Sequence, residues 1–303
     1  MLRGLKAMGC RPTAIVTLSD DGGSSGRLRR DLGVPPPGDV RACITALAED
    51  EDVMTRLMAH RFQRGELAGH AVGNLLLAGM TELVGSFDAA VELASRTLAI
   101  RGRVLPATGV GVALVAEMMD GRVVAGEAAL AHDRSSVRRL ALEPWNPPAS
   151  EAAIEAIDEA DLIVLGPGSL FTSTIPPLLV PGIHEAVLAS SARRLYVANL
   201  LQQPGETLGY DAATHVRRLH QHLGAGIVHT VLVPTVRRVP TIDHQTAVLF
   251  VKKELRATGV EVVVARITDG FRHDPLALGR AVLRQARRRK PGAVAREAAA
   301  RAG

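Results

Sequence analysis

The stretch DLIVLGPGSLFTS, residues 161–173, decides the fold class. It joins a short apolar run, 162–165, to a turn that contains Gly166 and Gly168, and then to hydroxyl side chains. An apolar run of this length without alternation is typical of a strand that is buried on both faces. Because a glycine-rich turn and a helix start follow directly, the stretch predicts an α/β protein.

Helix and strand patterns alternate on both sides of this stretch. A helical pattern at 151–160 comes before it, and helical and apolar runs take turns after it. Such alternation predicts a mostly parallel sheet whose strands are joined by right-handed helical crossovers. The expected later helices are 183–191, 211–223 and 275–286, and the expected strands are 194–200, 227–233, 247–251 and 260–267.

The N-terminal half predicts one strand followed by helices. The apolar run TAIVTL, residues 13–18, ends in the glycine-rich loop SDDGGSSG, residues 19–26. We expect one helix to begin near Arg27 and the next to be capped by Asp39. Further helices are expected at 51–61, 69–85 and 86–100.

Residues 112–144 predict an antiparallel β-hairpin insertion. An Asp-Gly pair, Asp120 and Gly121, separates the apolar runs 112–119 and 122–130. Such a pair between apolar runs is a strong hairpin signal. We expect the insertion to extend to 137–144.

Composition and length restrict the class of protein. The chain has 303 residues, of which 47% are hydrophobic and 22% charged, and it contains only 2 cysteines. These values predict a folded cytoplasmic protein without a disulfide framework, and the chain has neither an apolar run of membrane-spanning length nor a secretory leader pattern. We expect one domain over residues 1–290 and a flexible tail, rich in alanine and basic residues, over 291–303.

The basic residues are concentrated near the C-terminus rather than on one face. The net charge is +5, and much of the excess lies in Arg284 to Lys290. Aromatic residues make up only 3%, which argues against stacking platforms for single-stranded nucleic acid. Nucleic-acid binding by this cluster is therefore the weakest of three functional hypotheses, and a solvated helix end is the simpler interpretation.

Three loops that follow expected strands carry the polar side chains of a candidate ligand site, because ligands bind outside the carboxyl ends of parallel strands. The first is 19–27, whose glycines, serines and helix start suit anions and whose carboxylates suit a hydroxyl or a metal. The second is 166–173, a candidate phosphate cradle. The third is 199–207, whose amides and carboxylate suit a base or a sugar. Local turns and helix caps are the structural alternative for the first two loops, and a solvated loop for the third.

Two smaller motifs are ambiguous between binding and structure. Asp39 and Arg41 lie around a helix start, where the arginine suits phosphate and the aspartate suits capping. His70 and Asn74 are four residues apart and should share a helix face. A Walker A motif is absent, and the third glycine of a dinucleotide fingerprint is replaced by Phe171.

Five motifs together resemble the bacterial gluconeogenesis factor family, which is related to 2-phospho-L-lactate transferase. They are DDGGSSGRLRRDLGVPPPGDVRACITALA (20–48), GHAVGNLLLAGMTELVG (69–85), VLPAT (104–108), ADLIVLGPGSLFTSTIPPLLVPGI (160–183) and NLLQQPGETLGYDAATHV (199–216). The resemblance implies a Rossmann-like three-layer α/β/α fold and a pocket for a nucleotide or a nucleotide sugar of the UDP-sugar class. It also implies a role in cell shape and cell-wall supply during gluconeogenic growth.

The resemblance keeps a second hypothesis open, in which the protein transfers a phospholactyl-type group from a nucleotide diphosphate donor to a deazaflavin-type acceptor. This alternative allows for magnesium or a base at Asp20 or Asp21, whereas the binding hypothesis requires no certain cofactor. Neither hypothesis involves a membrane, and both are compatible with a homo-oligomer. The candidate catalytic residues are Asp20 and Asp21, and the candidate binding residues are Gly22, Gly23, Ser24, Ser25, Arg27, Asp39, Arg41, His70, Asn74, Gly166, Gly168, Ser169, Thr172, Ser173, Asn199, Gln203, Glu206 and Thr207.

The chain departs from the family pattern at its start. Members begin with a strand and a glycine-rich loop before the helix that corresponds to LRGLKAM, residues 2–8. Without that strand we expect an unpaired sheet edge. Ala42, Ala71, Pro177 and Gln202 also stand where Asn, Ser, Asn and Thr are expected, so hydrogen-bonding groups of the ligand site differ.

Overall fold

Four parallel strands form the larger sheet of this computed structural model, which describes residues 1–303 apart from 50–52, 134, 236–245, 271 and 289–303. The two central strands are buried along almost their whole length, as apolar strands covered on both faces should be. The sheet confirms the expected parallel arrangement. Its order is β6 (Leu162–Leu165), β7 (Arg193–Val197), β8 (Thr230–Pro234) and β9 (Glu261–Ala265).

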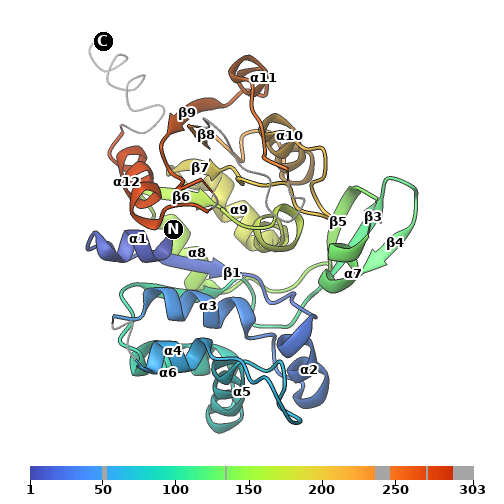
Figure 1. The fold of residues 1–303 in the computed structure, drawn as a ribbon, viewed down its shortest axis with the longest axis vertical. Helices are drawn as coiled ribbons and strands as arrows, with labels where there is room; N and C mark the ends of the chain where they lie inside the picture. Colours follow the sequence, from blue (N-terminus) through green and yellow to red (C-terminus); the bar gives the residue numbers. More distant parts are fainter. Residues whose placement is uncertain (50–52, 134, 236–245, 271, 289–303) are drawn as a thin grey trace.

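Helices cover both faces of this sheet and give the expected three layers (Figure 1). Side chains along β7 alternate between the faces. Tyr196 belongs to the larger core cluster, whereas Leu195 and Val197 pack in the cluster that contains Leu5 and Leu278. The second face is covered by α1 (Leu2–Ala7) and α12 (Pro275–Ala286), and the first by α8 (Glu151–Asp158), α9 (Pro181–Ala189), α10 (Ala212–Leu223) and α11 (Lys252–Ala257).

The N-terminal half forms a second, two-stranded parallel sheet with its own core. Strand β1 (Thr13–Val16) pairs in parallel with β2 (Arg103–Pro106). Leu18, Ile44 and Phe87 are buried together in the core beneath it. The intervening helices are α2 (Gly23–Leu32), α3 (Gly38–Leu47), α4 (Val53–Ala59), α5 (Val72–Val84) and α6 (Phe87–Thr97).

Two helix starts differ from the expectation. Helix α2 begins at Gly23, before Arg27, so the serines of the first loop lie in its first turn. Asp39 is not the N-cap of α3, because Pro37 occupies that position and Asp39 lies inside the first turn. A carboxylate in a first turn still interacts favourably with the helix dipole.

The antiparallel insertion is confirmed, but the second half of the run 122–130 is helical. Strand β3 (Ala113–Met118) pairs with β4 (Val123–Ala125) and with β5 (Val137–Glu143). The strand expected over 122–130 stops at Ala125, because Gly126 has a φ of +96° and starts α7 (Glu127–His132).

The prediction of a strand over 247–251 is wrong. This segment makes one isolated bridge, between Ala247 and Leu201, and the Val248 amide donates to the Leu200 carbonyl. It lies along the third loop rather than in a sheet, and α11 begins directly after it. A short apolar run indicates burial but does not by itself distinguish a strand from an irregular buried segment.

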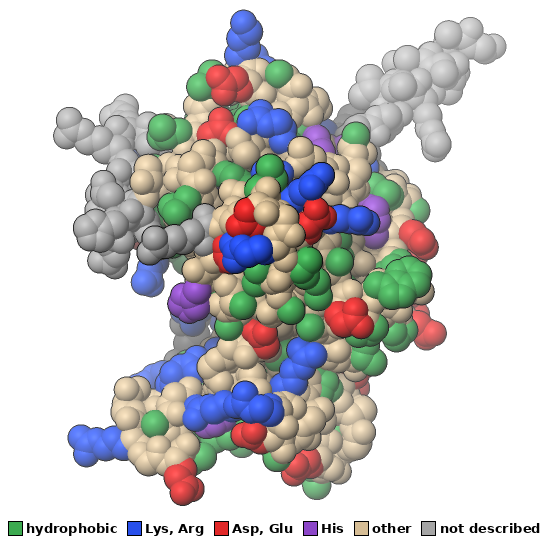
Figure 2. All heavy atoms as spheres, turned by 90° about the vertical axis from the view of Figure 1, so that its right-hand side faces the viewer, with side chains coloured by type: hydrophobic (Ala, Val, Ile, Leu, Met, Phe, Trp, Pro, Cys, Tyr) green, Lys and Arg blue, Asp and Glu red, His purple; other side chains and the backbone are tan. Residues whose placement is uncertain are grey.

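The described helices include none that is long and apolar enough to cross a membrane. The tail expected over 291–303 lies outside the described residues. On the face drawn in Figure 2, Lys and Arg side chains are interspersed with acidic and apolar ones rather than forming a continuous basic surface.

We predict that Gly102→Ala destabilises the protein, because Gly102 has a φ of +134° and an added Cβ would lie 2.2 Å from the Pro12 carbonyl oxygen. The Arg103 amide donates to that same oxygen at 3.0 Å, at the start of the β1–β2 pair. The expected loss in free energy of unfolding is about 2–4 kcal/mol, measured by urea denaturation. Gly79→Ala on the exposed side of α5 is the control, with an expected gain of up to about 1 kcal/mol. Equal stabilities of the two variants would contradict the assignment.

Candidate functional site

The first loop turns tightly before α2. The Asp20 carboxylate accepts a hydrogen bond from the Gly22 amide at 2.9 Å, which is an Asx turn. Ser24 and Ser25 are buried in the first turn of α2. The Arg27 side chain donates to the Ala68 carbonyl at 2.7 Å and so braces the loop before α5. The structural alternative therefore accounts for part of this motif.

A chain of hydrogen bonds links the buried polar residues of α2, α3 and α5. The Arg41 Nε donates to Asn74 Oδ1 at 2.9 Å, and Asn74 Nδ2 donates to Ser24 Oγ at 3.1 Å. Ser24 Oγ lies 3.0 Å from His70 Nδ1. His70 and Asn74 were expected on one helix face, but α5 begins at Val72, so His70 precedes it. The two residues meet at Ser24 instead, and this network holds the three helices together.

The turn after β6 is closed by a buried carboxylate from the third loop. Gly166 has a φ of +73°, and a π-helical turn, η1 (Leu170–Thr174), begins after Ser169. Glu206 accepts the Phe171 amide and the Thr172 hydroxyl, both at 3.3 Å. Burial raises the pKa of Glu206. One amide of the expected phosphate cradle is therefore already taken by this carboxylate.

The third loop contacts the second through side-chain amides. Gln203 Nε2 donates to Ser169 Oγ at 2.5 Å, and Asn199 Nδ2 donates to Gln203 Oε1 at 3.1 Å. The Thr207 hydroxyl accepts the Gln203 amide at 2.9 Å, which fixes the loop. Asn199 is only 8% exposed, yet its Oδ1 accepts no hydrogen bond from the described residues. This oxygen is therefore available to a hydrogen-bond donor of a ligand.

Helix α7 of the insertion joins the first and third loops. The Ala128 amide, at the N-terminus of α7, donates to Asp21 Oδ1 at 2.9 Å. An added Cβ at Gly126 would lie 2.1 Å from Asp21 Oδ2, so the Asp21 carboxylate lies directly against the backbone of Gly126. On the other side, an added Cβ at Gly205 would lie 2.2 Å from the Ala131 carbonyl oxygen. The first and third loops therefore meet at α7, and the second loop joins them through its contacts with the third.

Glu127 is the residue that the sequence analysis missed. Burial is the largest cause that raises the pKa of its carboxyl group, followed by the carboxylates of Asp20, Asp39, Glu206 and Asp21, and together they bring this pKa to about 8. Its Oε2 is buried and accepts no hydrogen bond from the described residues. A carboxyl group with such a pKa exchanges a proton near neutral pH. The only signal in the sequence was its position after Gly126, inside an apolar run.

The carboxylates of this region do not form a metal centre. Within the described residues, no group of three or more His, Cys, Asp or Glu side chains is placed to hold a metal ion. Asp20, the candidate metal ligand, instead receives the Gly22 amide.

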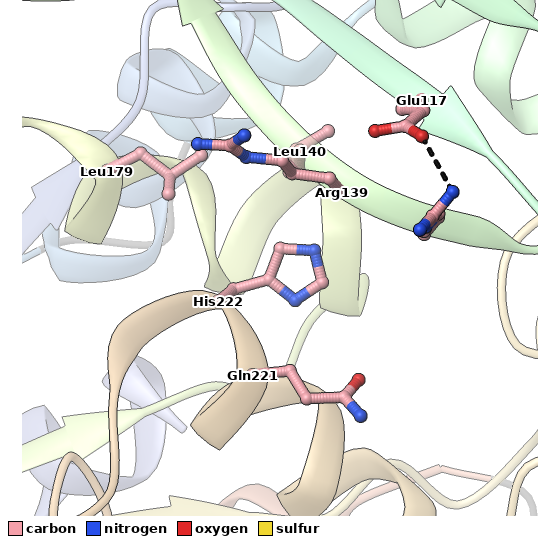
Figure 3. Close-up of a pocket in the computed structure, with 7 residues that line it drawn as sticks. Glu117, Arg139, Leu140, Leu179, Gln221 and His222 are labelled. Carbon is pink, nitrogen blue, oxygen red and sulfur yellow. Dashed lines mark hydrogen bonds and ion pairs between the residues drawn. The ribbon is translucent and has the colours of Figure 1, made fainter.

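A groove of about 1000 Å³ leads to this region from between β1 and β6. Four of the predicted site residues line it, namely Asp39, Gly166, Gly168 and Ser173. A second hollow of about 510 Å³ lies between β5 and α10. There the imidazole of His222 faces the gap between Arg139 and Gln221, and Arg138 forms an ion pair with Glu117 at 3.1 Å (Figure 3).

We predict that Glu127→Gln stabilises the protein at alkaline pH. An acid whose pKa is raised by folding contributes full stability below its ordinary value of 4.5 and loses it as the pH rises through about 8. The variant should therefore gain about 1–2 kcal/mol at pH 9 and about nothing at pH 5. Denaturant unfolding at both pH values tests this expectation. Glu151→Gln, an exposed first-turn glutamate of α8, is the control, and an equal response of both variants would refute the role of Glu127.

Comparison with known proteins identifies the family. A sequence profile described as 2-phospho-L-lactate transferase CofD matches residues 1–268. The gluconeogenesis factor of Bacillus subtilis (strain 168) is 46% identical over 285 residues, which cover 90% of this chain and 90% of that protein. The gluconeogenesis factor of Halalkalibacterium halodurans is 43% identical over 294 residues, covering 93% and 91% of the two chains.

A solved structure agrees with the sequence comparisons. The crystal structure of a UPF0052 family protein from Bacillus halodurans superposes with a TM-score of 0.88 at 42% identity, and the match covers 93% of this chain and 94% of that chain. The resemblance in sequence and the three-layer fold thus point to the same relatives. The chain belongs to the CofD family, and it is similar throughout most of its length to members named gluconeogenesis factors.

Proposed function

We propose that the protein binds a nucleotide sugar of the UDP-sugar class at the site around α7. In this proposal it is a cytoplasmic regulator of cell shape and cell-wall supply during gluconeogenic growth. The gluconeogenesis factor name of its relatives supports the physiological part. The two free thiols, Cys10 and Cys43, suit a reducing compartment.

The observation that carries the binding proposal is the buried Oδ1 of Asn199, which accepts no hydrogen bond within the described part of the chain. A buried acceptor without a donor costs about 1–3 kcal/mol, and a ligand N–H or O–H at this point would remove that cost. Asn199 is held in place through Gln203, which in turn contacts Ser169 of the glycine-rich turn. A base or sugar that meets Asn199 would therefore have its phosphates near the turn.

The remaining groups suit the other parts of a nucleotide sugar. The amides of the turn at Gly168 and Ser169 suit a diphosphate, since glycine lets a ligand approach the backbone closely. The carboxylate of Asp20 repels phosphate, and the carboxyl groups of Asp20, Asp39 and Glu127 accept hydrogen bonds from ribose or hexose hydroxyls. A ligand with phosphates at one end and hydroxyls at the other would place its phosphates at the backbone amides and its hydroxyls at the carboxyl groups.

We predict that millimolar UDP-sugar raises the Tm by several degrees, because a ligand at a hundred times its Kd stabilises by about 2.7 kcal/mol. Asn199→Ala should weaken binding about tenfold, the effect of one lost hydrogen bond, in titration calorimetry. Gln221→Ala, in the second hollow, should bind like the parent protein. Binding that is unaffected by Asn199→Ala would reject this site, and no Tm shift with any UDP-sugar would reject the ligand class.

The second candidate function is transfer of a phospholactyl-type group, which the CofD family description and the raised pKa of Glu127 favour. An acceptor hydroxyl would attack the phosphorus that bears the lactyl group. The new oxygen–phosphorus bond would replace the bond to the leaving nucleoside monophosphate, and the hydroxyl proton would pass to an ionised carboxylate such as Glu127.

We predict that any such activity is lost at least a hundredfold in Glu127→Gln, the usual contribution of a general base. The assay combines the protein with magnesium, a lactyl nucleotide diphosphate and a deazaflavin acceptor, and follows the product by mass spectrometry. The control is Glu151→Gln, which should keep full activity. Absence of product from the parent protein at all pH values between 6 and 9 would eliminate the transferase alternative.

A further inference from the structure

The second hollow, between β5 and α10, gathers charged and polar side chains that the candidate site does not use. Its volume of about 510 Å³ is typical of a small-molecule site. Helix α10 contributes Gln221 and His222, β3 contributes Glu117, and β5 contributes two consecutive arginines, Arg138 and Arg139. None of these residues belongs to the three loops of the candidate site. The hollow is therefore considered as a site of its own.

A β-bulge brings both arginines to this hollow. In a regular strand, neighbouring residues point to opposite faces of the sheet. Glu117 of β3 pairs with Arg139. The next residue of β3, Met118, pairs with Val137, so Arg138 is the extra residue of a bulge in β5. Bulges change the direction of side chains and are frequent beside functional sites. Arg138 and Arg139 therefore line the same hollow, although they are adjacent in the strand.

The two arginines differ in their partners. Arg138 forms the ion pair with Glu117 at 3.1 Å, which Figure 3 marks with a dashed line. Arg139 has no ion pair or hydrogen bond within the described part of the chain. Because the ion pair is neutral as a whole, the lining of the hollow carries one positive charge in excess, and that charge belongs to Arg139.

His222 presents a buried hydrogen-bond acceptor. Its Nδ1 lies 2.8 Å from the Arg218 carbonyl oxygen and therefore carries the proton. Burial is the largest influence on the pKa of His222 and lowers it, as do the charges of Arg218 and Arg139, so the ring is neutral at pH 7. Its Nε2 is buried and has no hydrogen-bond partner among the described residues. Phe171 packs edge to face against the ring at 5.6 Å between centroids and fixes its orientation.

The remaining lining residues suit a ligand with both polar and apolar surface. Gln221 Oε1 accepts a hydrogen bond from Arg218 Nη1 at 3.0 Å, which leaves the Gln221 amide nitrogen to donate to a ligand. The Glu117 carboxylate can accept hydrogen bonds besides the one in its ion pair. Leu140 and Leu179 add apolar contact. The hollow thus combines one free cation, several hydrogen-bonding groups and a small apolar surface.

We propose that this hollow binds a sugar acid, a compound with one carboxylate and several hydroxyl groups. The carboxylate pairs with the Arg139 guanidinium, whose planar fork matches its two oxygens. One hydroxyl donates to His222 Nε2, and others bond to the Glu117 carboxylate and the Gln221 amide. The C–H groups of the ligand pack against the two leucines.

Charge and hydrogen bonding favour this class over three related ones. A phosphate monoester carries about 1.5 to 2 negative charges at pH 7, which exceeds the single positive charge in excess and meets the Glu117 carboxylate. A neutral sugar leaves the Arg139 guanidinium without a partner. A fatty acid of the same length leaves His222 Nε2 without a donor, and an unpaired buried polar group is unfavourable. A monoanion with hydroxyl groups satisfies all three residues.

The first test compares gluconate with glucose, hexanoate and glucose 6-phosphate by titration calorimetry of the full chain at constant ionic strength. Gluconate should bind about tenfold more tightly than each of the others, the effect of one charge-assisted hydrogen bond. Saturable binding of gluconate with this order of affinities supports the proposal. Absence of gluconate binding at millimolar concentration, or affinity for any of the other three compounds that equals or exceeds that for gluconate, would overturn it.

A pair of matched variants locates the carboxylate of the ligand. Arg139→Gln should weaken gluconate binding about tenfold or more, and the fold should tolerate it because the side chain is exposed. Arg280→Gln replaces an exposed arginine of α12, on the other face of the larger sheet, and should bind gluconate like the parent protein. Equal affinities of the two variants would overturn the proposal.

Nitrogen-15 NMR of the imidazole rings reports on the hydroxyl contact. The Nε2 signal of His222 is identified by its absence in His222→Phe. Gluconate should move this signal in the parent protein, because Nε2 accepts a hydrogen bond from the ligand, and the same concentration should not move it in Arg139→Gln. A signal that stays unmoved in the parent protein at saturating gluconate would overturn the proposal.

The site of nucleotide-sugar binding is tested separately. Asn199→Ala should bind gluconate like the parent protein, because Asn199 does not line this hollow. Loss of gluconate binding in this variant would place gluconate in the candidate site and overturn the proposal. Since none of these measurements contains a nucleotide sugar, a failure of nucleotide-sugar binding does not affect their outcome.

Discussion

The hydrogen bond from the Ala128 amide to the Asp21 carboxylate is the interaction on which the site depends. It joins the antiparallel insertion to the first loop, two segments more than 100 positions apart in the chain. Because Asp21 caps α7, the helix dipole favours the carboxylate there and fixes the direction of the helix. With α7 in place, Gly205 brings the third loop against its other side. An insertion that looks peripheral in the topology is thus the centre of the site.

Electrostatics separates this site into two parts. Around Glu127, burial and after it the neighbouring carboxylates raise the pKa values of Glu127 and Asp39. Around Gly168 the polar groups are backbone amides, hydroxyls and side-chain amides, and the carboxyl group of Glu206 there is bonded to the Phe171 amide and the Thr172 hydroxyl. Such separation favours a ligand whose own charge is uneven along its length. The separation follows from the fold, since Asp20, Asp39 and Glu127 come from the helical half and the insertion, whereas the amides come from loops of the larger sheet.

The sequence was informative where a pattern was local and strong. The strand β6, the helices of the second half and the Asp-Gly hairpin were all predictable from apolar periodicity and turn residues. Strand β2 was not, because its four residues carry no alternation. Glu127 was missed because a short apolar run hid the start of α7. Its role arises from neighbours that are distant in the chain, such as Asp20 and Glu206, and periodicity contains no information about them.

The hairpin tip and α7 differ in how strongly their surroundings constrain them. The tip at Asp120 and Gly121 is exposed, whereas the residues after β4 are pressed against Asp21. The tip therefore tolerates insertions and deletions. An inserted residue between β4 and α7 would instead move Gly126 away from Asp21. A reporter or an affinity tag inserted at this tip should therefore leave the site around α7 intact.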